Sequence, residues 1–133
     1  MILIRNCRMI DPASGTDGLR DILTDGSRIA RIGAAGSITV PDGDVRVIEA
    51  DGLAAAPGLV DTHVHFRDPG AEYKEDIFTG AKAAAAGGFT SVVLMANTTP
   101  HVDNEETLSY VTEKGKKTGI HVYTCANGTM DMA

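Results

Sequence analysis

The feature that most constrains the fold is an alternation of strand-like and helix-like segments after Pro57. Strand patterns cover residues 59–66, 91–96 and 120–125, and helix patterns cover residues 76–86 and a second segment that starts at Asp103. The run at 91–96 is almost continuously apolar, as expected of a strand buried on both faces. Strands that alternate with helices indicate an α/β fold with a parallel sheet and right-handed crossovers.

Shorter runs precede Pro57. The sequence Asp25-Gly26-Ser27 separates two apolar runs and predicts a hairpin. A second Asp-Gly pair, Asp42-Gly43, precedes another strand pattern at 45–49. Residues 1–56 therefore predict a small antiparallel β unit, and residues 57–133 a separate α/β unit. The alternative for residues 1–56 is a free β module, although strands this short would leave one face uncovered.

Composition excludes several classes of protein. Hydrophobic residues make up 43% of the chain and charged residues 23%, which argues against a disordered or membrane-spanning chain. The net charge of −6 and the lack of a basic stretch argue against nucleic-acid binding. The two cysteines, Cys7 and Cys125, are too few for a disulfide scaffold, and no signal-peptide pattern is seen. We therefore expect a cytoplasmic protein without a membrane partner.

The strongest chemical signal is the run from Asp61 to Arg67, which contains His63 and His65. Side chains alternate along a strand, so Asp61, His63, His65 and Arg67 are predicted to share one face. Val60, Thr62, Val64 and Phe66 would form the opposite, mainly apolar face. Two imidazoles two residues apart can bind one metal ion, and zinc is the natural candidate. Such a pair often binds no metal, but Arg67 and the apolar opposite face favour a site.

Residues 57–70, Pro-Gly-Leu-Val-Asp-Thr-His-Val-His-Phe-Arg-Asp-Pro-Gly, resemble the first barrel strand of the amidohydrolase superfamily. More narrowly, they are similar to dihydroorotases of the longer, bacterial-type class. Segments 72–76, 80–90 and 95–98 continue the resemblance. One departure is Ala96, where the family usually has a proline that would fix the loop before Asn97.

The resemblance implies an incomplete metal-dependent hydrolase (β/α)8 barrel, consisting of the first two βα units and a third strand. The leading β unit would form part of a composite β-sandwich. His63 and His65 would bind zinc, with one or two ions in the complete enzyme, and Asp61 would orient an imidazole or be purely structural. Arg67 and Asn97 would hold the carboxylate of dihydroorotate, because a guanidinium binds a carboxylate bidentately.

The implied activity is reversible, zinc-dependent hydrolysis of the cyclic amide of dihydroorotate to carbamoyl-aspartate, in pyrimidine biosynthesis. A water acidified by the metal would attack the ring amide carbonyl. The implied partner is this small-molecule substrate, and the resemblance also allows a homo-oligomer or another pyrimidine-pathway enzyme as protein partner. No catalytic residue is assigned within the chain, since the general-base Asp is expected beyond residue 133.

Length limits this interpretation. A complete barrel needs about 250 residues, whereas Pro57 to Ala133 are 77 residues. We therefore expect a truncated dihydroorotase fragment that is inactive and aggregation-prone alone. The alternatives are a fragment of a sister cyclic amidase (allantoinase or hydantoinase) and a short non-catalytic protein that binds metal or a partner. The segment Tyr73–Asp76 and Asn97 argue against the sister amidase.

Other polar residues carry weaker expectations. Asp68 is predicted to be a loop residue without a special role, and His101 and His121 are expected to have none. Cys125 is expected to be a small buried thiol. The charged residues of segment 72–76 are expected to form a solvated face.

Overall fold

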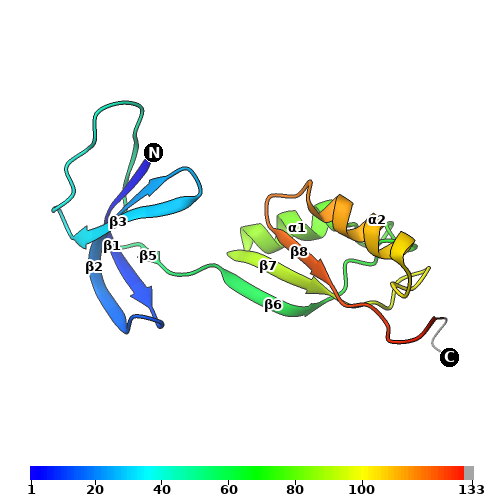
Figure 1. Ribbon diagram of the computed structural model, residues 1–133. Helices are drawn as coiled ribbons and strands as arrows, with labels where there is room; N and C mark the ends of the chain where they lie inside the picture. Colours follow the sequence, from blue (N-terminus) through cyan, green and yellow to red (C-terminus); the bar gives the residue numbers. More distant parts are fainter. Residues whose placement is uncertain (131–133) are drawn as a thin grey trace. The chain divides into compact units, whose positions relative to one another are not determined.

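A computed structural model describes residues 1–130 (Figure 1). It divides into two compact units, Met1–Pro57 and Gly58–Ala133. In the part of the chain that is described, no helix is long and apolar enough to span a membrane.

The first unit is a five-stranded sheet in the order β3-β2-β1-β4, with β5 also paired to β1. Its strands are β1 (Ile2–Asp11), β2 (Thr16–Asp25), β3 (Arg28–Ala34), β4 (Arg46–Glu49) and β5 (Ala54–Ala55). The predicted hairpin is confirmed: β2 and β3 pair antiparallel around a two-residue turn in which Gly26 has φ 54°. The prediction of a wholly antiparallel sheet was wrong, because β4 and β5 pair parallel with β1. The long connection from β3 to β4 makes this possible, since it returns the chain to the free edge of β1.

A buried carboxylate, that of Asp21, joins two separate backbone segments of the first unit. Asp21 is fully buried and accepts hydrogen bonds from the backbone N–H groups of Asn6 (3.0 Å) and Ile38 (3.2 Å). Burial by itself would raise the pKa of Asp21, but these backbone hydrogen bonds outweigh it and the pKa is lowered. Asp21 thereby fixes the loop after β3 against the middle of β1, at the irregular pairing around Asn6.

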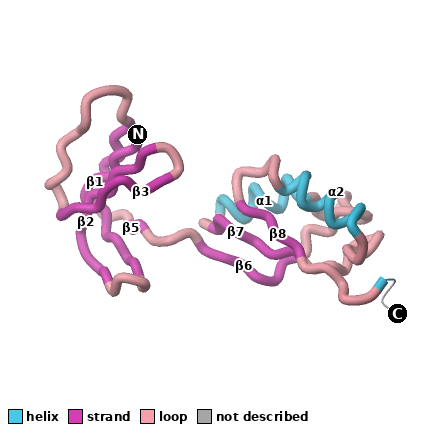
Figure 2. Tube along the Cα trace, in the orientation of Figure 1, coloured by secondary structure: helices cyan, strands magenta, loops and turns pink. Residues whose placement is uncertain are grey.

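The second unit confirms the predicted alternation. Its elements are β6 (Leu59–Val64), α1 (Ile77–Ala86), β7 (Phe89–Leu94), α2 (Glu105–Gly115) and β8 (His121–Thr124). The three strands form a parallel sheet in the order β6-β7-β8. Figure 2 shows both helices together on one side of these strands.

The helix starts follow from their caps. Asp76 caps α1, where its side chain accepts from the Thr79 N–H and the Thr79 hydroxyl bonds back in a capping box. The predicted start of α2 at Asp103 was wrong by one residue, because Asn104 is the cap and accepts from the Thr107 N–H at 3.0 Å. The strand β6 ends at Val64, two residues before the predicted end.

A single apolar cluster joins the helices to the sheet. Its buried members come from both helices, the strands and the loops between them: Phe66, Ile77, Ala81, Val92, Leu94, Ala96, Val102 and Val111. Val64 packs against this cluster, but Val60 is 59% exposed, which contradicts the predicted common face. The reason is an irregular register in β6, where Val60 pairs with Ser91 and Val64 with Leu94. Two register shifts therefore interrupt the simple alternation of side chains.

Helix α1 lies so close to Phe66 that Gly80 has no room for a side chain. A Cβ at Gly80 would lie 2.5–2.7 Å from the Phe66 ring. A helical Gly-to-Ala change normally stabilises by about 1 kcal/mol, but we expect Gly80→Ala to lower the free energy of unfolding by about 1–3 kcal/mol through overpacking. Urea unfolding of the Gly80→Ala variant and of the unmodified protein measures this difference. Gly119→Ala is the control, because a Cβ there meets nothing within 4 Å. An equal or greater stability of Gly80→Ala would contradict this close packing.

Candidate active site

Two histidines lie together at the carboxyl end of β6. His63 belongs to the strand and His65 follows its last residue, Val64. Their ring centroids are 5.2 Å apart and the rings are edge to face, at 66°. His63 is exposed and His65 is half-buried. The predicted pair therefore offers two imidazoles side by side at the edge of the sheet where ligands bind in parallel α/β folds.

The end of β7 contributes Asn97 to the same place. The Asn97 Oδ1 lies 2.9 Å from the Nδ1 of His65. An amide oxygen only accepts, so in this amide orientation the contact needs a proton on Nδ1, and a neutral His65 ring would then have Nε2 unprotonated. The two strand ends are held together by a hydrogen bond from the Met95 N–H to the Val64 carbonyl (3.0 Å). Asn97 is therefore placed to orient His65.

Arg67 lies beyond the strand, in a turn. Its backbone is left-handed, with φ 59°, and its carbonyl accepts from the Ala71 N–H at 2.8 Å. The side chain is exposed, and within residues 1–130 its guanidinium has no hydrogen bond or ion pair. The structure thus brings His63 beside His65 and His65 into contact with Asn97. Among residues 1–130, the Arg67 side chain forms no hydrogen bond with any of the three.

Asp61 interacts with the main chain. Its Oδ1 accepts a hydrogen bond from the His63 N–H at 3.0 Å, and Asp61 pairs with the core residue Val92. The carboxylate therefore fixes the backbone at His63, where the register of β6 is irregular.

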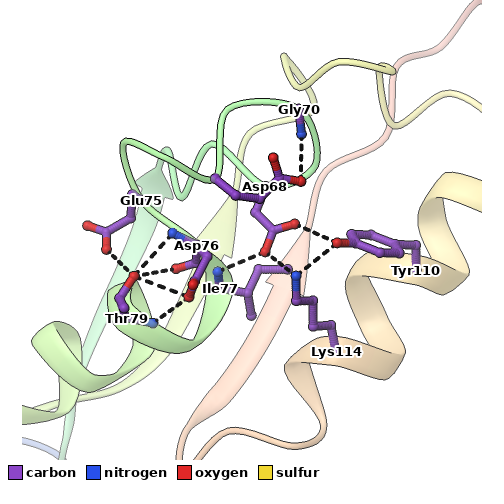
Figure 3. A network of polar contacts seen from close by, with 9 residues as sticks. Asp68, Gly70, Glu75, Asp76, Ile77, Thr79, Tyr110 and Lys114 are labelled. Atoms are coloured by element: carbon purple, nitrogen blue, oxygen red, sulfur yellow. Dashed lines mark hydrogen bonds and ion pairs between the residues drawn. The ribbon is translucent and has the colours of Figure 1, made fainter.

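Asp68 is the important residue that sequence reasoning missed. It is fully buried, and its carboxylate is surrounded by donors (Figure 3). The donors are the Ile77 N–H (3.0 Å), the Tyr110 hydroxyl (2.9 Å) and the Lys114 ammonium (2.7 Å). The only local signal is the spacing of Tyr110 and Lys114, four residues apart on one helix face. Nothing local links them to Asp68, which lies 42 residues before Tyr110.

Lys114 completes this network. Its ammonium also donates to the Tyr110 hydroxyl at 2.8 Å. Burial by itself would lower the pKa of Lys114, but the hydrogen bonds with Asp68 and Tyr110 outweigh it and the pKa is raised. Lys114 therefore remains charged across the physiological pH range and pairs with the buried carboxylate.

Some weaker expectations are corrected. Cys125 is exposed rather than buried, because it follows the edge strand β8 and no described residue covers it. The charged segment 72–76 is exposed or half-buried, in line with a solvated face, and within it Asp76 caps α1 and Glu72 accepts from the Gly70 N–H (2.9 Å). His121 is exposed and stacks on Tyr123.

The donor set fits part of a metal site. Imidazole nitrogens suit zinc, and the contact with Asn97 orients the ring of His65. Catalytic zinc generally has three protein ligands. Among the residues that the structure describes, no group of three or more His, Cys, Asp or Glu side chains could hold a metal ion. His63 and His65 therefore fit as two ligands of a larger set.

Solved structures with the same fold define the class. An L-hydantoinase (dihydropyrimidinase) from Arthrobacter aurescens matches with TM-score 0.72 and 26% identity, over 96% of this chain and 28% of that one. A D-hydantoinase (dihydropyrimidinase) from Thermus sp. matches with TM-score 0.68 and 29% identity, over 93% and 27%. The second unit and its site therefore have the fold of the metal-dependent amidohydrolases.

Sequence comparison identifies the family within that class. The model of the dihydro-orotase-like family matches residues 52–128, so the chain belongs to this family. A dihydroorotase of Streptococcus thermophilus (strain CNRZ 1066) is 51% identical over 129 residues, 97% of this chain and 30% of the relative. One of Clostridioides difficile (strain 630) is 52% identical over 126 residues, 95% of this chain and 29% of the relative. The resemblance to dihydroorotases is confirmed, and the chain spans about 30% of the length of these relatives.

The Asn97 contact predicts the tautomer of His65. In metal-free full-length protein we expect the His65 ring to carry its proton on Nδ1, because Asn97 Oδ1 accepts it. Asn97→Ala removes the acceptor and should shift the ring toward the Nε2–H form. Nitrogen-15 NMR of the imidazoles measures this, with the exposed His121 as the internal control. An Nε2–H ring in the unmodified protein would contradict the assigned hydrogen bond.

Proposed function

We propose that this chain forms the amino-terminal part of a dihydroorotase, a hydrolase that reversibly opens the cyclic amide of dihydroorotate to carbamoyl-aspartate. The observation that carries the proposal is the cluster at the strand ends, with His63 beside His65 and Asn97 bonded to His65. It occurs in a chain about half identical to dihydroorotases over almost its whole length.

The two histidines would hold zinc, one or two ions in the complete enzyme. Zinc in such a site acts as a Lewis acid that polarises a carbonyl oxygen and makes water a stronger nucleophile. Asn97 keeps the Nε2 of His65 available, and Asp61 fixes the main chain at His63. The remaining ligands and the general-base Asp would come from strands later in the complete protein.

Arg67 and Asn97 would hold the substrate carboxylate. The guanidinium of Arg67 is exposed and uncommitted in the described chain, so its planar donors can bind a carboxylate bidentately. Asn97 uses its Oδ1 for His65, and its amide N–H groups remain to donate to the same carboxylate. A single Asn would thus connect metal binding with substrate orientation.

A hydantoinase is the second candidate, because solved hydantoinases share the fold. Their 26–29% identity is well below the 51–52% of the dihydroorotases, which favours the first proposal. The expected small-molecule partner follows from the activity, and a cytoplasmic location and a homo-oligomer or pathway-enzyme partner belong to the same proposal.

The substrate assignment predicts the kinetics of an Arg67 variant. In the full-length zinc-loaded protein, Arg67→Met should raise the KM for dihydroorotate about tenfold or more, because it removes charge-assisted hydrogen bonds worth about 1.5–3 kcal/mol. Arg31→Met is the control, since Arg31 is exposed and lies in the first unit. Steady-state assays with dihydroorotate and with hydantoin measure kcat and KM for the substrate of each candidate function. Faster turnover of hydantoin than of dihydroorotate would contradict the proposal.

The fragment interpretation predicts the behaviour of residues 1–133 alone. Two imidazoles should bind zinc weakly and support no ring opening, because the remaining ligands and the base are lacking. Activity should appear when these residues replace the matching 30% of the Streptococcus thermophilus dihydroorotase. Calorimetry and a dihydroorotate assay with metal-free controls test this. Turnover by the short chain that is lost in His63→Ala would refute the interpretation, and tight stoichiometric zinc would favour a dedicated binding protein.

A further inference from the structure

The loop between β6 and α1 is fixed by one buried carboxylate that makes no contact with the histidines. Asp68 is 0% exposed and binds three donors, from the first residue of α1 and from two residues of α2. Figure 3 shows Ile77, Tyr110 and Lys114 converging on Asp68. One side chain therefore joins this loop to both helices.

Arg67, the residue before Asp68, has an unusual backbone. Its φ of 59° is in the left-handed region, which costs a non-glycine residue about 1–2 kcal/mol. Such a conformation persists where the surroundings enforce it. Here both neighbours are buried, with Phe66 8% exposed in the apolar core and Asp68 in the ion network. Because Phe66 and Asp68 are both held in the interior, the backbone turns at Arg67 and the Arg67 side chain is exposed to solvent.

The loop is also joined to the segment that carries Asn97. The Thr99 N–H donates to the Pro69 carbonyl at 3.1 Å. Gly70 lies so close to Thr99 that a Cβ would collide with its backbone. The loop that contains Arg67 and Asp68 is therefore joined to the segment that follows Asn97.

A buried ion pair is often no more stabilising than apolar residues of the same volume, but it can impose a single conformation. We propose that Asp68, held by Lys114 and Tyr110, is a positioning residue that fixes Arg67 for binding the substrate carboxylate. This inference rests on the proposed function for the identity of the ligand, and on the network itself for the geometry.

Two variants test it in the full-length protein. Lys114→Met keeps the apolar stem but removes the ammonium, and Tyr110→Phe removes a single oxygen and is the milder change. Lys116→Met is the matched control, because Lys116 on the same side of the sheet forms only an exposed pair with Glu113. Hydrogen exchange is followed at the amides of Ala71, bonded to Arg67, and Thr99, bonded to Pro69.

We expect both network variants to exchange these two amides faster and to raise the KM for dihydroorotate about tenfold, as expected for a weakened charged contact, while kcat changes less than about threefold. Lys116→Met should change neither. Unchanged exchange in both variants would overturn the proposal, and so would faster exchange with an unchanged KM, since Asp68 would then be purely structural. Absence of dihydroorotate turnover in the unmodified protein would refute the proposed function instead, and the exchange data would still decide whether the network holds the Arg67 turn.

Discussion

The parallel pairing of β6 with β7 is the constraint on which the site depends. Neighbouring parallel strands end at the same edge, so His65 and Asn97 meet although 32 residues separate them. The Met95 N–H continues this pairing past the end of β7 by binding the Val64 carbonyl. Without that register, Asn97 would not meet the Nδ1 of His65. The part of the candidate site that contains the two histidines and Asn97 is therefore a property of the sheet.

The sheet also explains why these residues suit a larger assembly. Helices cover one face, whereas on the other Tyr123 is 56% exposed and Val93 and Met95 are only half-buried. Within the described residues, β6 and β8 each have one strand neighbour. Parallel sheets are almost always covered on both faces, and the chain spans 30% of its relatives. In the proposed complete dihydroorotase, further strands would cover the open face and bring more side chains to the edge where His63 and His65 lie.

Patterns with a short period were predictable from sequence. The strand–helix alternation and the hairpin at Gly26 depend on neighbouring residues, and the structure contains both. The predicted face of a side chain was wrong where irregular pairing interrupts the alternation along a strand. Val60 is the example, because register shifts in β6 change the face on which it lies. Long-range ionic contacts were also invisible, because no local pattern links Asp68 to Lys114. Cys125 shows a third limit, since burial depends on what covers an edge strand.

The two parts of the candidate site are held by different means. The sheet orients the imidazoles, whereas Arg67 depends on a loop anchored by Asp68 to two helices. Barrel enzymes change chemistry by changing the loops that follow their strands while the strands are kept. The solved hydantoinases share the fold of this chain at 26–29% identity, so the fold by itself does not identify the substrate, and the side chains that the loops present carry that information. In the proposed enzyme, the charge of Arg67 that would bind the substrate carboxylate is placed by the buried Asp68, whose partners Tyr110 and Lys114 lie on α2, so substrate binding would respond to changes in α2.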